Sequence, residues 1–130
     1  PVTDAGYDWD SYVKYGRQRF LTAPLMKWMF GKYVSDPAQR GNDLMSPVRA
    51  SAERLRGLPA TLIVVAENDI LRDEGEKMGR LLDAAGVEVT TVRFNGVVHD
   101  WGMLNGFAAL HPTRTLIRLV GSVLRDYLEK

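Results

Sequence analysis

Two short segments of the chain carry the hydrophobic pattern of buried β-strands. Residues 60–67 are almost continuously apolar rather than alternating, which is typical of a strand covered on both faces in a parallel sheet. Residues 87–94 have the composition of a second strand. The pattern therefore predicts an α/β fold in which the segment between the two strands forms a crossover.

That intervening segment has the signals of an amphipathic helix. Asp73 can cap its start, Glu76 can close a capping box, and Gly86 can end it. Its apolar stripe consists of Met78, Leu81, Leu82 and Ala85. A strand, a helix and a returning strand form a βαβ unit, whose crossover is right-handed in nearly all cases and makes the strands parallel.

Two further helices are predicted, one before this unit along the chain and one after it. Thr22 can cap a helix that opens with Ala23-Pro24 and runs to Val34. Its apolar positions at helical spacing are Leu25, Met26, Met29, Phe30 and Tyr33. Pro112 begins the last helix, and we expect its apolar stripe to pack on the sheet. That stripe consists of Leu116, Ile117, Val120, Val123, Leu124, Tyr127 and Leu128.

The remaining segments read as connections. Residues 1–16 are polar and aromatic without a sustained period, so we expect a loop with one short helical turn. Residues 36–47 contain two prolines, Gly41 and Asn42, a density of breakers that predicts an irregular connection. We therefore expect residues 1–57 to form a helical, connecting part and residues 58–130 to form a β-α-β-α part of a single partial domain.

Composition narrows the class of protein. The 130 residues are 45% apolar, which suffices for one domain but is short for a complete α/β enzyme. The net charge of +1 comes from 17 basic and 16 acidic residues, so nucleic acid is not an expected partner. No apolar stretch reaches the roughly 20 residues of a membrane span. The absence of cysteine fits a reducing compartment, and we expect a cytoplasmic location.

Candidate chemistry lies just after each predicted strand. Asp69 follows the first strand by two residues, and His99 follows the second by five. Because parallel strands end at the same edge of a sheet, the topology brings this acid and this imidazole together. In Ser-His-Asp enzymes, the acid fixes the imidazole tautomer while the imidazole takes the proton of the nucleophile. Asp69 and His99 are therefore candidates for two members of such a triad.

Simpler interpretations compete with this one. Asp69 could merely cap the following turn, and His99 could be a surface histidine. His111, just before Pro112, is interpreted as structural or solvated. Asp73, Glu74 and Glu76 could be imagined as metal ligands, but acids in a first helical turn favour the helix dipole without a metal. No metal site is expected.

Three motifs carry a resemblance to a known family. The segment from Leu58 through Asp69 to Gly75 resembles the acid loop of the hormone-sensitive-lipase-like α/β-hydrolases. Phe94-Asn95-Gly96-Val97-Val98-His99 resembles the Tyr-x-Gly-x-x-His turn of that family, and Ser46-Pro47 is similar to its Ser-Pro before the acid strand. The resemblance implies the carboxyl-terminal half of an α/β-hydrolase fold, with two parallel strands, a βαβ crossover and a packed last helix.

The resemblance also implies an activity and roles for two residues. The position of Asp69 matches the triad acid of these esterases, and that of His99 matches their general base. The family nucleophile lies on a Gly-x-Ser-x-Gly elbow that precedes the acid, and no serine here has that context (Ser11, Ser35, Ser46, Ser51 and Ser122). We therefore expect a serine carboxylesterase or lipase-type enzyme without cofactor or metal, and an inactive isolated chain.

Four residues are candidates for the pocket of a small-molecule ester. Met26, Met29 and Phe30 belong to the apolar helix, although a stripe at helical spacing is more often ordinary packing. Trp101 lies two positions after His99, where the family usually has His-Gly-Phe. This chain has His99-Asp100-Trp101, and Asp100 would disturb the base only if it pointed at the imidazole.

Two other function classes remain open from the residues. A phosphoacceptor receiver domain has a similar apolar strand followed by acids, but it needs an acceptor Asp on a later strand, which the chain after Phe94 lacks. A noncatalytic, self-associating α/β module is the stronger alternative, because a two-stranded parallel sheet is marginal in water. In the resembling family the last strand is commonly a dimer edge, which implies a homodimer.

Overall fold

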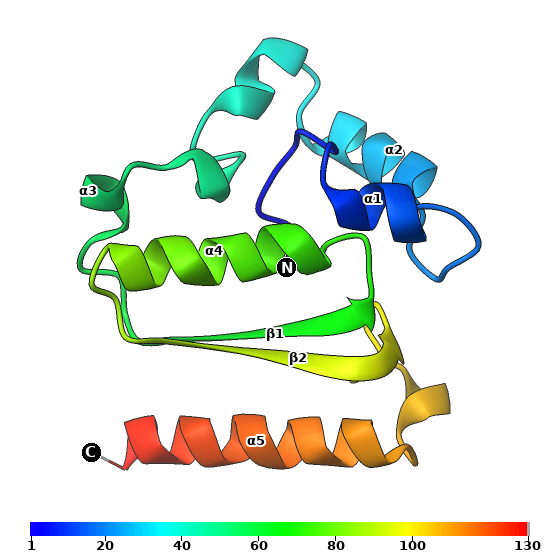
Figure 1. Ribbon diagram of the computed structural model, residues 1–130, viewed down its shortest axis with the longest axis vertical. Coiled ribbons are helices and arrows are strands. Elements are labelled where there is room, and N and C mark those ends of the chain that lie inside the picture. Colours follow the sequence, from blue (N-terminus) through cyan, green and yellow to red (C-terminus); the bar gives the residue numbers. More distant parts are fainter. Residues whose placement is uncertain (130) are drawn as a thin grey trace. The chain divides into compact units, whose positions relative to one another are not determined.

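Residues 1–99 contain a two-stranded parallel sheet, and one face of this sheet packs against a helix (Figure 1). The computed structural model describes residues 1–129. Its contacts divide the chain into two units, residues 1–99 and residues 100 onward. The first unit contains α1 (Asp10–Tyr15), α2 (Ala23–Tyr33), α3 (Ala52–Leu55), β1 (Thr61–Asn68), α4 (Arg72–Ala84) and β2 (Val89–Val98). The second contains α5 (His111–Leu128).

The sheet confirms the predicted α/β class. Strand β1 pairs with β2 in parallel, with Thr61 opposite Val89 and Ala66 opposite Phe94. Ile63 and Val65 on β1 are buried with Met78 and Leu82 of α4 in one hydrophobic cluster. The sequence of strand, helix and parallel strand is the predicted βαβ unit, and apolar packing between α4 and the sheet holds it together.

Strand β2 is longer than predicted, because it continues past Phe94 to Val98. The register shifts between Ala66 and Asn68, and Gly96 adopts a positive φ of 75°, a conformation that glycine tolerates without steric cost. This irregularity lets the strand continue for four more residues. His99 therefore follows the second strand directly, rather than five residues after it.

Helix α4 forms as predicted, but its predicted cap is wrong. The helix begins at Arg72, and its N-cap residue Leu71 makes no side-chain cap hydrogen bond. Asp73 lies inside the first turn, where its carboxylate accepts from the backbone N–H of Ser11 and from Arg72. Glu76 pairs with Arg93 at 3.4 Å instead of closing a capping box. Ser11 and Arg93, which are distant along the chain, thus bind the carboxylates that the local pattern assigned to the cap.

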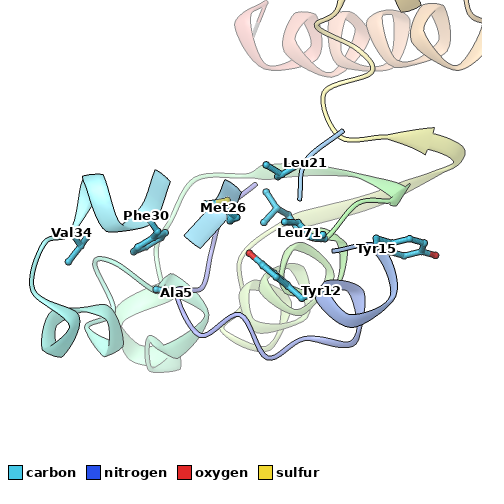
Figure 2. Close-up of a cluster of buried hydrophobic side chains, with 9 residues drawn as sticks. Ala5, Tyr12, Tyr15, Leu21, Met26, Phe30, Val34 and Leu71 are labelled. Carbon is cyan, nitrogen blue, oxygen red and sulfur yellow. The ribbon is translucent and has the colours of Figure 1, made fainter. Parts of the chain in front are cut away.

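Helix α2 begins where the sequence predicted, with the Thr22 hydroxyl accepting from the N–H of Leu25 at 3.3 Å. Its inner face joins a buried cluster with residues from α1 and from the loop before α4 (Figure 2). The cluster consists of Ala5, Tyr12, Tyr15, Leu21, Met26, Phe30, Val34, Ile70 and Leu71. Apolar packing therefore fixes α1 and α2 against the loop that follows β1.

The second unit consists mainly of α5, which has Pro112 in its first turn as predicted. Within this unit, Gly102 lies so close to Leu116 that a Cβ on the glycine would meet the leucine side chain at 2.3 Å. The packing of the α5 stripe on the sheet stays a prediction. Among residues 1–129, no helix has both the length and the apolar character required to cross a membrane.

Candidate active site

The structure brings Asp69 and His99 into direct contact. Asp69 Oδ2 lies 2.8 Å from His99 Nδ1. Because an ionised carboxylate only accepts hydrogen bonds, Nδ1 carries the proton in this contact. The Asp69 side chain is nearly buried, whereas about a fifth of the His99 side chain is exposed. The pair thus combines a sheltered acid with an imidazole that has access to solvent.

The second carboxylate oxygen of Asp69 binds a different partner. Oδ1 accepts the backbone N–H of Leu71 at 2.9 Å, and the Asp69 carbonyl accepts from the N–H of Arg72 at 3.2 Å. Asp69 therefore caps the turn before α4, as the simpler interpretation expected, and contacts the imidazole at the same time. The two interpretations are compatible because each uses a different oxygen.

An apolar cavity of about 380 Å³ adjoins His99. Met26, Met29 and Phe30, the three pocket candidates on α2, all line it. The rest of the lining includes residues that the sequence pattern had not singled out as pocket candidates. These are Val2, Leu21, Tyr33, Leu44, Met45, Pro47 and Leu71. They come from four separate segments of the chain, so no single helical or strand period could have found them.

The other candidate residues lie in the second unit. Trp101 is buried there, and its role in a pocket stays a prediction. Asp100 is exposed and has a positive φ of 58°, and its carbonyl accepts the N–H of Met103 in a turn. His111 is exposed at the first residue of α5, in agreement with its interpretation as a structural or solvated histidine.

Sequence reasoning missed the residues that hold the loop of Asp69. Ser11 is completely buried, donates its hydroxyl to the carbonyl of Ile70 at 2.5 Å, and donates its N–H to Asp73. Arg72 donates to the carbonyl of Glu67 and to the Tyr15 hydroxyl. The partners of Ser11 are about 60 positions away along the chain, so no local motif indicates them.

Glu74 is a second buried group that the sequence did not indicate. Its side chain is completely buried, and Oε1 accepts the backbone N–H groups of Thr3 and Asp4. Burial raises the pKa of Glu74 to about 7, although these two amide donors act in the opposite direction. Asp4 in turn binds Arg49 and the indole N–H of Trp9. Glu74 therefore anchors the first residues of the chain to α4.

Comparison with known proteins identifies the family. The profile of the alpha/beta hydrolase fold matches residues 1–103, most of the chain. The chain belongs to the α/β-hydrolase family. Its expected likeness to the hormone-sensitive-lipase-like esterases is confirmed, and the match excludes the receiver alternative.

Relatives of this α/β-hydrolase chain include named esterases. Ethyl acetate hydrolase of Pseudomonas putida is 37% identical over 101 residues, which are 78% of this chain and 31% of that protein. Vegetative-specific protein H5 of Dictyostelium discoideum is 32% identical over 117 residues, 90% of this chain and 33% of its own. The chain spans about a third of the length of the curated relatives it matches.

Solved structures show the same relationship. A thermostable esterase from Pseudomonas putida ECU1011 superimposes with a TM-score of 0.91 at 45% identity, covering 93% of this chain and 38% of that one. The hyperthermophilic esterase of Pyrobaculum calidifontis superimposes with a TM-score of 0.85 at 35% identity, covering 98% and 41%. At these identities the α/β-hydrolase fold of the chain is established.

Proposed function

We propose that this chain supplies the acid and the base of a serine carboxylic-ester hydrolase. The observation that carries the proposal is the 2.8 Å contact between Asp69 Oδ2 and His99 Nδ1. With Nδ1 protonated and held by the carboxylate, Nε2 is the ring nitrogen that takes the proton of an attacking serine hydroxyl. The same nitrogen then returns the proton to the leaving alcohol, while Asp69 stabilises the imidazolium.

The nucleophile of this reaction must come from outside the 130 residues. None of the five serines stands in a Gly-x-Ser-x-Gly sequence, and Ser11, the serine nearest to the acid loop, is buried with its hydroxyl donated to a backbone carbonyl. The chain by itself is therefore expected to be inactive. The relatives, which are about three times as long, support a parent protein that carries the serine.

The cavity beside His99 supports a small ester as the substrate. Its lining by Met26, Met29 and Phe30 offers an apolar surface to the non-reacting part of the ester, and hydrophobic burial stabilises the bound state by about 25 cal/mol per Å². A volume of about 380 Å³ suits a short or medium chain.

The roles of Asp69 and His99 are tested in the complete protein by Asp69→Asn and His99→Ala. Each variant should lower kcat for a p-nitrophenyl ester by a factor on the order of 10⁴, with an unchanged circular dichroism spectrum. The exposed residues Asp83 and His111 provide matched controls, because Asp83→Asn and His111→Ala make the same chemical changes away from the pair. Near-normal turnover in either site variant would refute the assignment.

The noncatalytic alternative and the expected homodimer both predict that two copies of the chain associate. In the described part of the chain the sheet has only the strands β1 and β2, and unpaired strand edges are templates for pairing with another chain. We propose that β2 pairs with a second copy. Light scattering should then give the mass of two chains, and a clean monomer at high concentration would contradict this.

The cytoplasmic location stays a prediction.

A further inference from the structure

Ser11 is linked to the Asp69–His99 pair through a single peptide group. The Ser11 hydroxyl donates to the carbonyl oxygen of Ile70, and the next N–H along the chain, that of Leu71, donates to Asp69 Oδ1. The carbonyl of Ile70 and the N–H of Leu71 belong to the same planar peptide unit. Ser11 therefore binds one side of this planar peptide, and the other side of the peptide binds Asp69, the proposed triad acid.

The link continues through the carboxylate to the imidazole. Asp69 binds Leu71 N–H through Oδ1 and His99 Nδ1 through Oδ2, so the orientation of the peptide determines the orientation of the carboxylate plane. Hydrogen bonds in such chains also polarise one another. Donation to the Ile70 carbonyl therefore strengthens donation by the Leu71 N–H.

The residues of this link are buried. Ser11 and Ile70 are completely excluded from solvent, and Leu71 is almost completely so. The N–H of Ser11 is itself fixed by Asp73 Oδ2 at 2.8 Å, which ties the first turn of α1 to the first turn of α4. Because Ile70 is completely excluded from solvent, loss of the Ser11 hydroxyl removes a hydrogen-bond donor from a buried carbonyl.

We propose that Ser11 is a positioning residue for the triad acid, acting through the Ile70–Leu71 peptide on Asp69 and thereby on the tautomer of His99. The proposal rests on the proposed function for its effect on catalysis. Its effect on the imidazole follows from the contacts alone. Ser11 makes no contact with substrate in this role and is not a catalytic residue.

The test compares Ser11→Ala with Ser46→Ala in the complete protein. Ser46 is a matched control, because it is also completely buried and also donates its hydroxyl to a backbone carbonyl, that of Arg40. The first readout is the ratio of the two neutral tautomers of His99, measured by ¹⁵N NMR of the ring. Ser11→Ala should lower the Nδ1–H to Nε2–H ratio roughly 5-fold, and Ser46→Ala should leave it unchanged.

Ester turnover supplies the second readout. Ser11→Ala should lower kcat roughly 10-fold with KM changed less than twofold, because misorientation of the base affects the reaction step and not the apolar cavity. A Ser11→Cys variant, which keeps a weaker donor on a somewhat larger atom, should fall between wild type and Ser11→Ala in both readouts. If Ser11→Ala does not fold, Ser11→Cys decides the question in its place.

The outcomes separate this proposal from the proposed function. If the complete protein hydrolyses no ester but Ser11→Ala still shifts the His99 tautomer ratio, the positioning role stands and the esterase proposal fails. If ester hydrolysis is present but the tautomer ratio and kcat of the Ser11 variants equal those of wild type, the positioning role is overturned. Equal tautomer shifts in the Ser11 and Ser46 variants would also overturn it, since the effect would then be a general loosening of the fold.

Discussion

The stability of the Glu74→Gln variant relative to wild type should increase as the pH rises from acidic to alkaline. Glu74 is completely buried, and burial raises its pKa from the ordinary value of 4.5 to about 7. Glutamine keeps a carbonyl oxygen that can accept the N–H groups of Thr3 and Asp4. It places an uncharged amide where Glu74 Oε2 has no hydrogen-bond partner among the described residues.

The sign and size of this effect follow from the two pKa values. A carboxyl whose pKa is higher in the folded state binds its proton more tightly there, so its stabilising effect is complete below pH 4.5 and is lost as the pH rises through 7. The interval from 4.5 to about 7 corresponds to about 3 kcal/mol, at 1.36 kcal/mol for each pH unit. Wild type loses this stability with rising pH, and the glutamine variant does not.

Urea unfolding at pH 5, 6, 7 and 8, followed by tryptophan fluorescence, measures the effect. The unfolding free energy of Glu74→Gln minus that of wild type should increase by about 2 to 3 kcal/mol from pH 5 to pH 8. Glu53→Gln, at an exposed position on α3, should give a difference that does not change with pH. A pH-independent difference for Glu74→Gln would refute the reasoning, because the carboxyl would then ionise alike in the folded and unfolded states.

Three further substitutions test the packing. Gly79→Ala should destabilise the protein by about 1 to 3 kcal/mol, because its Cβ would meet the Thr91 hydroxyl at 2.1 Å; an unchanged urea midpoint would contradict the close contact of α4 with β2. Gly121→Ala on α5, where a Cβ meets nothing within 4 Å, should instead stabilise by about 0.5 to 1 kcal/mol, and a lowered melting temperature would argue against an open position. Phe30→Ala should cost about 3 to 5 kcal/mol and raise KM, since Phe30 belongs to both the core and the cavity; an unchanged KM would exclude it from the substrate pocket.

The parts of the fold that follow local rules could be predicted from the sequence. The continuous apolar run of β1, the Thr22 cap of α2 and the Gly86 end of α4 each depend on residues within a few positions of one another. The contact of Asp69 with His99 also followed from a general rule, because the βαβ topology brings the ends of parallel strands to one edge.

The parts that depend on distant residues could not be predicted. Asp73 and Glu74 looked like ordinary acids of a first helical turn, yet one binds Ser11 and the other binds the amides of Thr3 and Asp4. These partners are 62 to 71 positions away. The length of β2 was missed because a register shift and the positive φ of Gly96 let the strand pass its apparent end.

The most direct test of the account is ester hydrolysis by proteins of two lengths. Release of p-nitrophenol from p-nitrophenyl acetate would be measured for the 130-residue chain and for the same protein extended upstream through a Gly-x-Ser-x-Gly elbow. The account predicts hydrolysis by the longer protein alone, abolished there by His99→Ala. Equal hydrolysis by the 130-residue chain would contradict it, because a nucleophile within these residues would then have to carry the reaction.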